Sequence, residues 1–445
     1  NKFLLYILKQ STIVRPNAIA TNIINALYLN SDLKSTFSLI NIQKFPENLN
    51  KILNNFNSNS LLIQFMKVCP IPNYFFEKNF KKIRKELLDN IYVRDFNTNY
   101  LEFSISLSTQ CFLNEYVYSE TKEEIDKVQK ISERIKNKIY KNKKINDLEI
   151  IILSCYVPLY NFDWCKNIKP SNNLLEIFNL QFKNKTEEQE ELLSIKSISK
   201  VSNDISIKVK KQYEENPYPR WTNLGLSFQS RGVKDVINDI NLNFDLTKKN
   251  FPKKIDILIA GCGTGQHIIT TASKYKNSTI YGLDLSYNSL AYAKRKAKEF
   301  GFNNINFIQG DLLDLKRMNK KFDIIECVGV LHHMEDPMAG WKKLRNLLRS
   351  GGLLKIGLYS EFARKHIVEL REEIRISKVG VTDDAIKSFR HTLIQSNSES
   401  YQNISLFDDF YSLNEFNDLL FNVKEHRFTL TQIQKCLVEL DLTFC

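Results

Sequence analysis

A glycine-rich turn is the feature of this sequence that points most directly to chemistry. Gly261, Gly263 and Gly265 follow the apolar run 255–260 and precede a stretch with a helical pattern. Glycines let the backbone turn tightly and pass close to a ligand, and the helix that follows leaves free amide groups facing that ligand. The third glycine comes one residue too early for the dinucleotide fingerprint G-x-G-x-x-G. The turn therefore predicts a ligand site and disfavours a nicotinamide-dependent oxidoreductase.

Acidic and histidine residues follow the next apolar runs along the chain. Asp284 ends one run, Asp311 follows another, and His332 and His333 come shortly after a third. Asp284 is placed to accept hydrogen bonds from the two hydroxyls of a ribose, and Asp311 from an adenine amino group. The alternative is that both aspartates cap local backbone. Because carboxyl ends of parallel strands share one edge of a sheet, we expect these residues to converge there.

The elements that must position these residues follow from the hydrophobic pattern. Apolar runs alternate with helical stripes between about residues 250 and 360, which predicts right-handed βαβ units and a parallel sheet. Before Gly225 the chain has no glycine, and Phe76, Phe80 and Ile83 begin a helical stripe. We predict an α/β fold, a Rossmann-like doubly wound sheet preceded by an all-α N-terminal domain. The predicted parts are a helical domain at 1–180, a linker at 181–210, and the sheet domain at 211–445 with a helical insertion at about 361–425.

The segment 213–221 contains two prolines and several aromatic residues. Pro217 and Pro219 exclude a regular helix through this segment and favour an extended arm. Tyr213 and Trp221 either fold over the ligand as a lid or form a hydrophobic clamp between domains.

The order and spacing of these motifs resemble those of class I S-adenosylmethionine-dependent methyltransferases. The resemblance covers about 255–360 and rests on the GCGTG turn, the acidic end of the second strand, and the GD after the third. The resemblance also includes two later segments, FDIIE…GVLHH and LLRSGGLLKIGLYS. The arm and the segment 409–428 are similar to a bacterial subgroup often linked to tetratricopeptide-like helical regions. The implied activity is methyl transfer from S-adenosylmethionine to an unidentified small molecule or protein.

The resemblance implies a role for each matching residue. The glycines would pass under the methionine portion, Asp284 would hold the ribose, and the backbone of Cys327 would line the pocket near the sulfonium. His332 or His333 is the candidate base, although a structural role for both is an alternative. Cys262 and Cys327 also fit as small packing residues. The full expected cofactor set is Gly261, Cys262, Gly263, Thr264, Gly265, Gln266, Asp284, Leu285, Asp311, Leu312, Cys327, Tyr213 and Trp221.

Two departures from the family pattern stand out. The position two before the first glycine is usually acidic, but here it is Ile259. Backbone carbonyls, Gln266 or another group would then have to bind the methionine ammonium. The chain also stops near the expected sixth strand, so we expect the seventh strand to be missing and the chain to be a piece of a longer protein.

Composition narrows the classes of partner and compartment. Of 445 residues, 43% are hydrophobic and 25% charged, which is typical of a globular protein. No apolar run approaches the length of a membrane span, and the eight cysteines lack C-x-x-C spacing. We therefore expect no metal, no membrane and a reducing cytoplasm.

The net charge of +13 is spread along the chain. An RNA methyltransferase remains an alternative that is not favoured, because a clustered basic stripe is missing. A second alternative is a non-catalytic module that binds the cofactor while its helical domain binds a protein partner.

Overall fold

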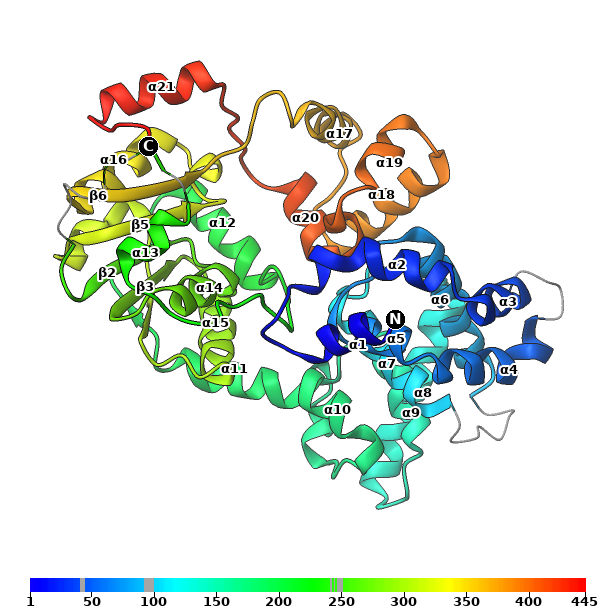
Figure 1. Cartoon of the computed structure of the whole chain (residues 1–445). Coiled ribbons are helices and arrows are strands. Elements are labelled where there is room, and N and C mark those ends of the chain that lie inside the picture. Colours follow the sequence, from blue (N-terminus) through cyan, green and yellow to red (C-terminus); the bar gives the residue numbers. More distant parts are fainter. Residues whose placement is uncertain (41–44, 92–99, 241, 244, 246–250) are drawn as a thin grey trace. The chain divides into compact units, whose positions relative to one another are not determined.

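The structure is a computed structural model that describes residues 1–40, 45–91, 100–240, 242–243, 245 and 251–445. The chain divides into two compact units (Figure 1). The first contains residues 1–186, 221–225 and 378–417, and the second contains 187–220, 226–377 and 418–445. Among the described residues, no helix has the length and hydropathy required for crossing a membrane.

The first unit is helical. Its helices bury apolar stripes, as the sequence predicted: Phe76, Phe80, Ile83 and Leu87 of α6 are all buried. Helix α8 starts with a capping box in which Thr121 and Glu124 satisfy each other's backbone amides. The helices are α1 (Lys2–Lys9), α2 (Ala20–Tyr28), α3 (Ser31–Ile40), α4 (Phe45–Ser58), α5 (Ser60–Val68), α6 (Tyr74–Asp89), α7 (Leu101–Leu113), α8 (Lys122–Tyr140), α9 (Asp147–Ser154), α10 (Leu175–Phe178), α18 (Asp383–Ser396) and α19 (Glu399–Ile404), and α20 (Leu413–Phe421) begins here.

The second unit is built on a parallel sheet of six strands among the described residues, in the order β1-β4-β3-β2-β5-β6. This confirms the predicted doubly wound α/β fold. The strands are β1 (Lys196–Ser197), β2 (Ile255–Ala260), β3 (Ser278–Asp284), β4 (Ile305–Gln309), β5 (Phe322–Val328) and β6 (Leu348–Gly357). The helices are α11 (Asn184–Leu192), most of which lies in this unit, α12 (Asp204–Glu215), α13 (Val233–Asn238), α14 (Gln266–Lys274), α15 (Tyr287–Glu299), α16 (Pro337–Leu347), α17 (Lys365–Ile376) and α21 (Leu430–Glu439).

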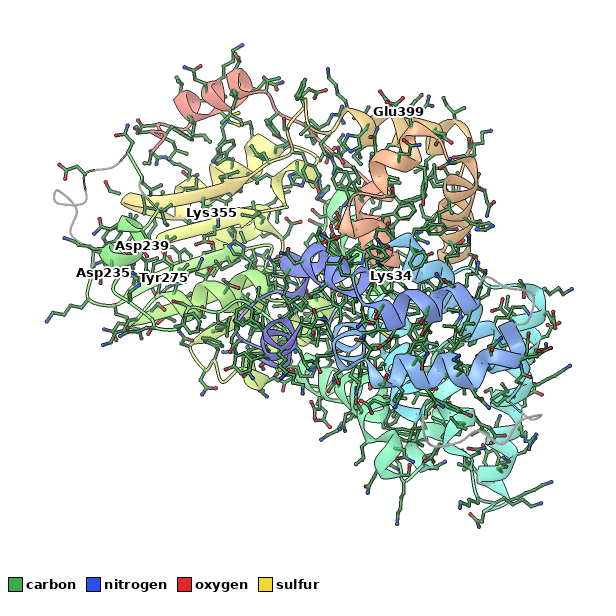
Figure 2. All side chains as sticks on the ribbon, turned by 45° about the vertical axis from the view of Figure 1, so that its right-hand side comes forward. Lys34, Asp235, Asp239, Tyr275, Lys355 and Glu399 are labelled. Atoms are coloured by element: carbon green, nitrogen blue, oxygen red, sulfur yellow. The ribbon has the colours of Figure 1, made fainter. Side chains whose placement is uncertain are left out.

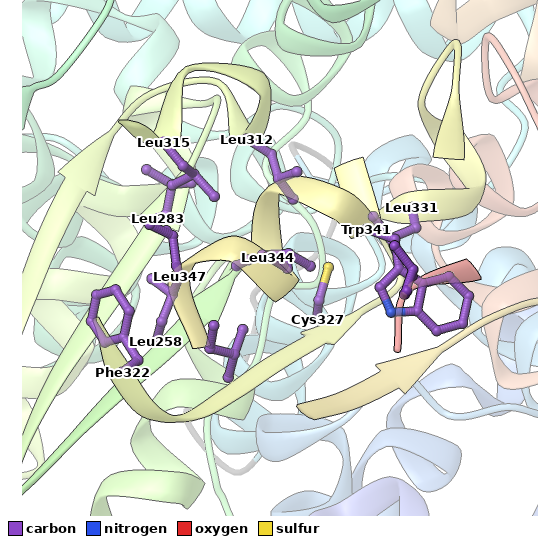
Figure 3. Close-up of a cluster of buried hydrophobic side chains, with 13 residues drawn as sticks. Leu258, Leu283, Leu312, Leu315, Phe322, Cys327, Leu331, Trp341, Leu344 and Leu347 are labelled. Atoms are coloured by element: carbon purple, nitrogen blue, oxygen red, sulfur yellow. The ribbon is translucent and has the colours of Figure 1, made fainter. Parts of the chain in front are cut away.

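Alternation along β2 sends side chains to both faces of this sheet. Leu258 and Ala260 belong to one buried cluster that also contains Leu344 of α16, and Figure 3 labels Leu258 and Leu344. Ile257 and Ile259 are equally buried but do not belong to that cluster. Both faces of the central strand are therefore covered, as a parallel sheet requires.

The division of the chain differs from the predicted boundaries. Residues 181–210, predicted as a linker, include α11, part of α12 and the edge strand β1. The predicted insertion 361–425 is helical, yet its residues 378–417 belong to the first unit. The described C-terminal residues 440–445 form no strand, so the strand expected there is not seen, and β1 adds a strand at the other edge of the sheet, beside β4.

Candidate functional site

The strand order fixes where a ligand crevice must lie in the second unit. The chain runs from β2 outward through β3 to β4 and then returns to β5, on the other side of β2. Connections after β2 and β5 therefore diverge, and open α/β sheets bind ligands at the carboxyl ends of such strands. The glycine turn follows β2, and the segment with His332 and His333 follows β5.

All three glycines of the turn have left-handed backbone, with φ of +74° at Gly261, +51° at Gly263 and +94° at Gly265. A Cβ on Gly261 would lie 2.0 Å from Val330 Cγ2, so close packing against the segment after β5 excludes a side chain there. The nearest atom to a Cβ on Gly263 is the Tyr218 carbonyl oxygen, at 3.6 Å. The protein itself therefore leaves space at Gly263.

Asp284, at the end of β3, holds this turn in place. Its carboxylate accepts hydrogen bonds from the Gly263 amide at 2.8 Å and the Ser286 amide at 3.0 Å. Burial raises the pKa of Asp284 and the negative charge of Glu214 adds to this, while hydrogen bonds from the amides of Ser286, Gly263 and Leu285 lower it. A carboxylate has about four lone-pair positions, so one remains for a ligand hydroxyl. Its neighbour Leu285 is half-buried, and the Leu285 carbonyl accepts a hydrogen bond from Gln309.

Asp311 is close to this group but is engaged locally. The preceding Gly310 amide donates to the Asp284 carbonyl at 3.0 Å. The Asp311 carboxylate accepts from the Leu313 amide at 2.9 Å, which is the capping role that the sequence left open. Leu312 packs into the buried cluster of Figure 3. Contact of Asp311 and Leu312 with an adenine stays a prediction.

The two cysteines of the expected site are buried. Burial raises the pKa of the Cys327 thiol to about 12 and that of Cys262 well above its usual value. Neither thiol is therefore poised as a nucleophile. Cys327 projects into the hydrophobic cluster, as Figure 3 shows.

The arm is bound to this site by several hydrogen bonds. The Thr264 hydroxyl donates to the Pro219 carbonyl at 2.7 Å. The Glu214 carboxylate accepts from the amides of Tyr287 and Asn288, both at 2.9 Å, and so caps the N-terminus of α15. Sequence reasoning missed Glu214, although a helix start without enough local acceptors is the signal for such a partner.

Part of the arm differs from its predicted extended form. Tyr213, Glu214 and Glu215 belong to the last turn of α12, and only the proline-containing part after them leaves the helix. Trp221 belongs to the first unit, where it is buried. Its predicted contact with the cofactor stays a prediction.

His333 belongs to a buried polar chain that the sequence did not reveal. The His333 Nδ1 lies 2.7 Å from the Lys424 carbonyl, so Nδ1 carries the proton and Nε2 keeps its lone pair. Asn422 lies 3.4 Å from Nε2 and donates at 3.0 Å to Asp418, which also accepts from the Tyr213 hydroxyl at 2.6 Å. Burial lowers the pKa of His333 and raises that of Tyr213.

His332 is packed quite differently. Its ring stacks on Tyr359 with centroids 3.8 Å apart, and the Arg364 guanidinium lies 3.9 Å from the Tyr359 ring centroid. Among the described residues, neither ring nitrogen reaches normal hydrogen-bond geometry. Burial, helped by the neighbouring His333 and Arg364, lowers the pKa of His332 to about 2. His332 is therefore neutral across the physiological range.

A charged group lies beside Ile259, the position at which the family pattern has an acid. Ile259 pairs in register with Glu326 of β5. Glu326 forms an ion pair with His267, and Lys355 lies 3.7 Å from the same carboxylate oxygen. Figure 2 labels Lys355, which belongs to the edge strand β6. Burial opposes ionisation of Glu326, but His267 and Lys355 bring its pKa below the usual value.

Residues 252–410 match a family model described as a methyltransferase domain. Over these residues the chain is similar to methyltransferases. The predicted family resemblance is thus confirmed for this segment, while the link to tetratricopeptide-like regions stays a prediction.

Parts of this chain are similar to several known proteins. An uncharacterized protein of Synechococcus sp. is 39% identical over 121 residues, which are 27% of this chain and 29% of that protein. The ubiquinone biosynthesis O-methyltransferase of Haemophilus ducreyi is 32% identical over 127 residues, 27% of this chain and 51% of that enzyme. This chain thus spans about half or less of these two relatives. The structure of PKMT2 from Rickettsia typhi with AdoHcy has a TM-score of 0.36 and 22% identity over 42% of this chain and 39% of that chain.

The methyltransferase domain fits the cofactor of its class at two places. The open space at Gly263 allows close approach of a ligand, and the remaining lone pair of Asp284 can accept a hydroxyl proton. Gly265 is the N-cap of α14, the helix that follows the turn.

Proposed function

We propose that the protein transfers a methyl group from S-adenosylmethionine to a small molecule or a protein side chain. The observation that carries the proposal is the left-handed glycine turn bonded to Asp284 at the carboxyl edge of the sheet. In this proposal Gly261, Cys262, Gly263, Thr264, Gly265 and Gln266 cradle the cofactor, with Asp284, Leu285, Asp311, Leu312, Cys327, Tyr213 and Trp221 around it.

S-adenosylmethionine, when bound, supplies an already activated methyl group, so the protein's main tasks are positioning and exclusion of water. The acceptor atom must then lose a proton. His333 is suited to take it, because its Nε2 lone pair is free of a proton and its Nδ1 is fixed by the Lys424 carbonyl. His332 is the second candidate, although its pKa of about 2 makes it a very weak base.

We also propose that the helical first unit binds a protein partner and that the protein works in the cytoplasm. Eight cysteines that are all free thiols support the second point. The observations carry no argument for a nucleic acid.

Isothermal titration with S-adenosylhomocysteine and NAD tests the proposal. We expect micromolar binding of S-adenosylhomocysteine only, a loss of this binding in Asp284→Ala, and no change in Asp441→Ala, which alters an exposed aspartate. An acceptor screen with labelled methyl donor follows. Absence of S-adenosylhomocysteine binding to the wild type would refute the proposal.

A further inference from the structure

The helical first unit contains a cavity that the methyltransferase chemistry does not use. The cavity has a volume of about 260 Å³ and lies between α6, α18 and the segment 117–124. All of its lining residues belong to the first unit. Six cationic side chains line it: Lys78, Lys81, Lys82, Lys85, Lys387 and Arg390.

The acidic side chains of the cavity are already engaged. Glu77 forms a bidentate pair with Arg390, at 2.8 and 2.6 Å. Glu124 closes the capping box of α8 and accepts a hydrogen bond from Tyr156 at 3.0 Å. Lys85 is paired with Asp89 at 2.6 Å, outside the cavity lining. These contacts leave an excess of positive charge in the cavity.

Three lysines carry this excess. Within the described part of the chain, no carboxylate oxygen lies within 4.0 Å of the ammonium groups of Lys78, Lys81 or Lys387. Lys81 is half-buried and donates to the Ser119 hydroxyl. Burial lowers the pKa of Lys81, and the positive charge of the nearby Arg84 lowers it further. An anion in the cavity would raise the pKa of Lys81 again.

The lysines surround a space that also has an apolar wall. Tyr74, Val117 and Ile394 line the same cavity as the ammonium groups. The cavity lies just below the range of about 300–1,000 Å³ typical of drug-sized ligands, so it suits a smaller molecule. Lysines bind phosphate as point charges and do so without a fixed planar geometry.

We propose that this cavity binds the phosphoryl group of a small organic phosphate monoester, with Lys81 and Lys387 as its principal cationic partners. The ester's organic part would contact Tyr74 and Ile394. The site is independent of the methyltransferase domain, and its test needs no methyl transfer.

The test uses the full chain and isothermal titration with inorganic phosphate and phenyl phosphate at constant ionic strength. Lys81→Gln and Lys387→Gln each remove one cation, and Lys136→Gln on the exposed face of α8 is the control with the same charge change. We expect one site per chain, tighter binding of phenyl phosphate, and about tenfold weaker binding in each cavity variant. The control should bind as the wild type does.

Several results would overturn the proposal. The first is absence of saturable binding by the wild type, and the second is equal weakening in all three variants, which would indicate general charge attraction. Equal affinity for the two probes would refute the organic contact. Thermal unfolding of each variant checks its fold, and Lys387→Gln keeps the proposal testable if Lys81→Gln does not fold.

Discussion

The amide of Gly263 donates a 2.8 Å hydrogen bond to the carboxylate of Asp284, which lies at the end of the neighbouring strand. One aspartate therefore holds the left-handed glycine turn and presents its remaining lone pair toward the same edge. The shape of the turn and the recognition of a ribose are coupled through this contact.

Replacing Asp284 with asparagine should separate stability from binding. Because burial raises the pKa of Asp284, its contribution to stability is greatest at low pH and is lost as pH rises through the folded-state pKa. At pH 8 we expect the melting temperature of Asp284→Asn to remain within a few degrees of the wild-type value. Toward pH 4 the melting temperature of the wild type should rise relative to that of the variant. Titration should show weaker binding of S-adenosylhomocysteine. A large loss of stability at pH 8 would contradict this account.

Alanine at Gly263 and at Gly261 should have different effects. Both positions have positive φ, which costs about 1–2 kcal/mol for a residue with a Cβ. At Gly261 the added Cβ would also lie 2.0 Å from Val330 Cγ2. Gly261→Ala should therefore have a lower melting temperature than Gly263→Ala. Gly263→Ala should fold but bind S-adenosylhomocysteine more weakly, because its methyl group occupies the open space. Normal binding by Gly263→Ala would show that the ligand does not approach this glycine.

Phenylalanine at His332 should preserve the stack on Tyr359. The folded-state pKa of about 2 lies far below the usual value of about 6.5, so wild-type stability falls as pH drops below the latter. Between pH 6 and pH 5, the free energy of unfolding of His332→Phe should fall by up to about 1.4 kcal/mol less than that of the wild type. Urea unfolding at each pH measures this difference. Retained methyl transfer in this variant would assign His332 to packing. Lost transfer with an intact fold would support its role as base.

Glutamine at Glu214 should loosen the arm. Glutamine offers one carbonyl oxygen where Glu214 accepts two amide hydrogen bonds, and it removes a charge at the start of α15. The free energy of unfolding should fall by about 1–2 kcal/mol. Amide hydrogen exchange should become faster at Tyr287 and Asn288. The control Glu215→Gln, which changes the exposed neighbour, should leave exchange unchanged, and slow exchange in both variants would argue against the cap.

The sequence alone determined strands β2 to β6 of the second unit and the glycine turn after β2. Strand and helix periods, the positive-φ glycines and the acidic end of β3 are local signals, because a few neighbouring residues decide them. The same local logic identified α6.

Only the tertiary structure decided which distant residues meet. Tyr213 reaches Asp418 across 205 positions, and Asn422 reaches His333 across 89. Strand β1 comes from a polar segment that has no strand pattern of its own and forms by pairing with β4. The packing of 378–417 with the first unit, including the Arg390–Glu77 pair, likewise had no local signal. Such contacts depend on how whole elements pack, and a pattern within one segment does not encode them.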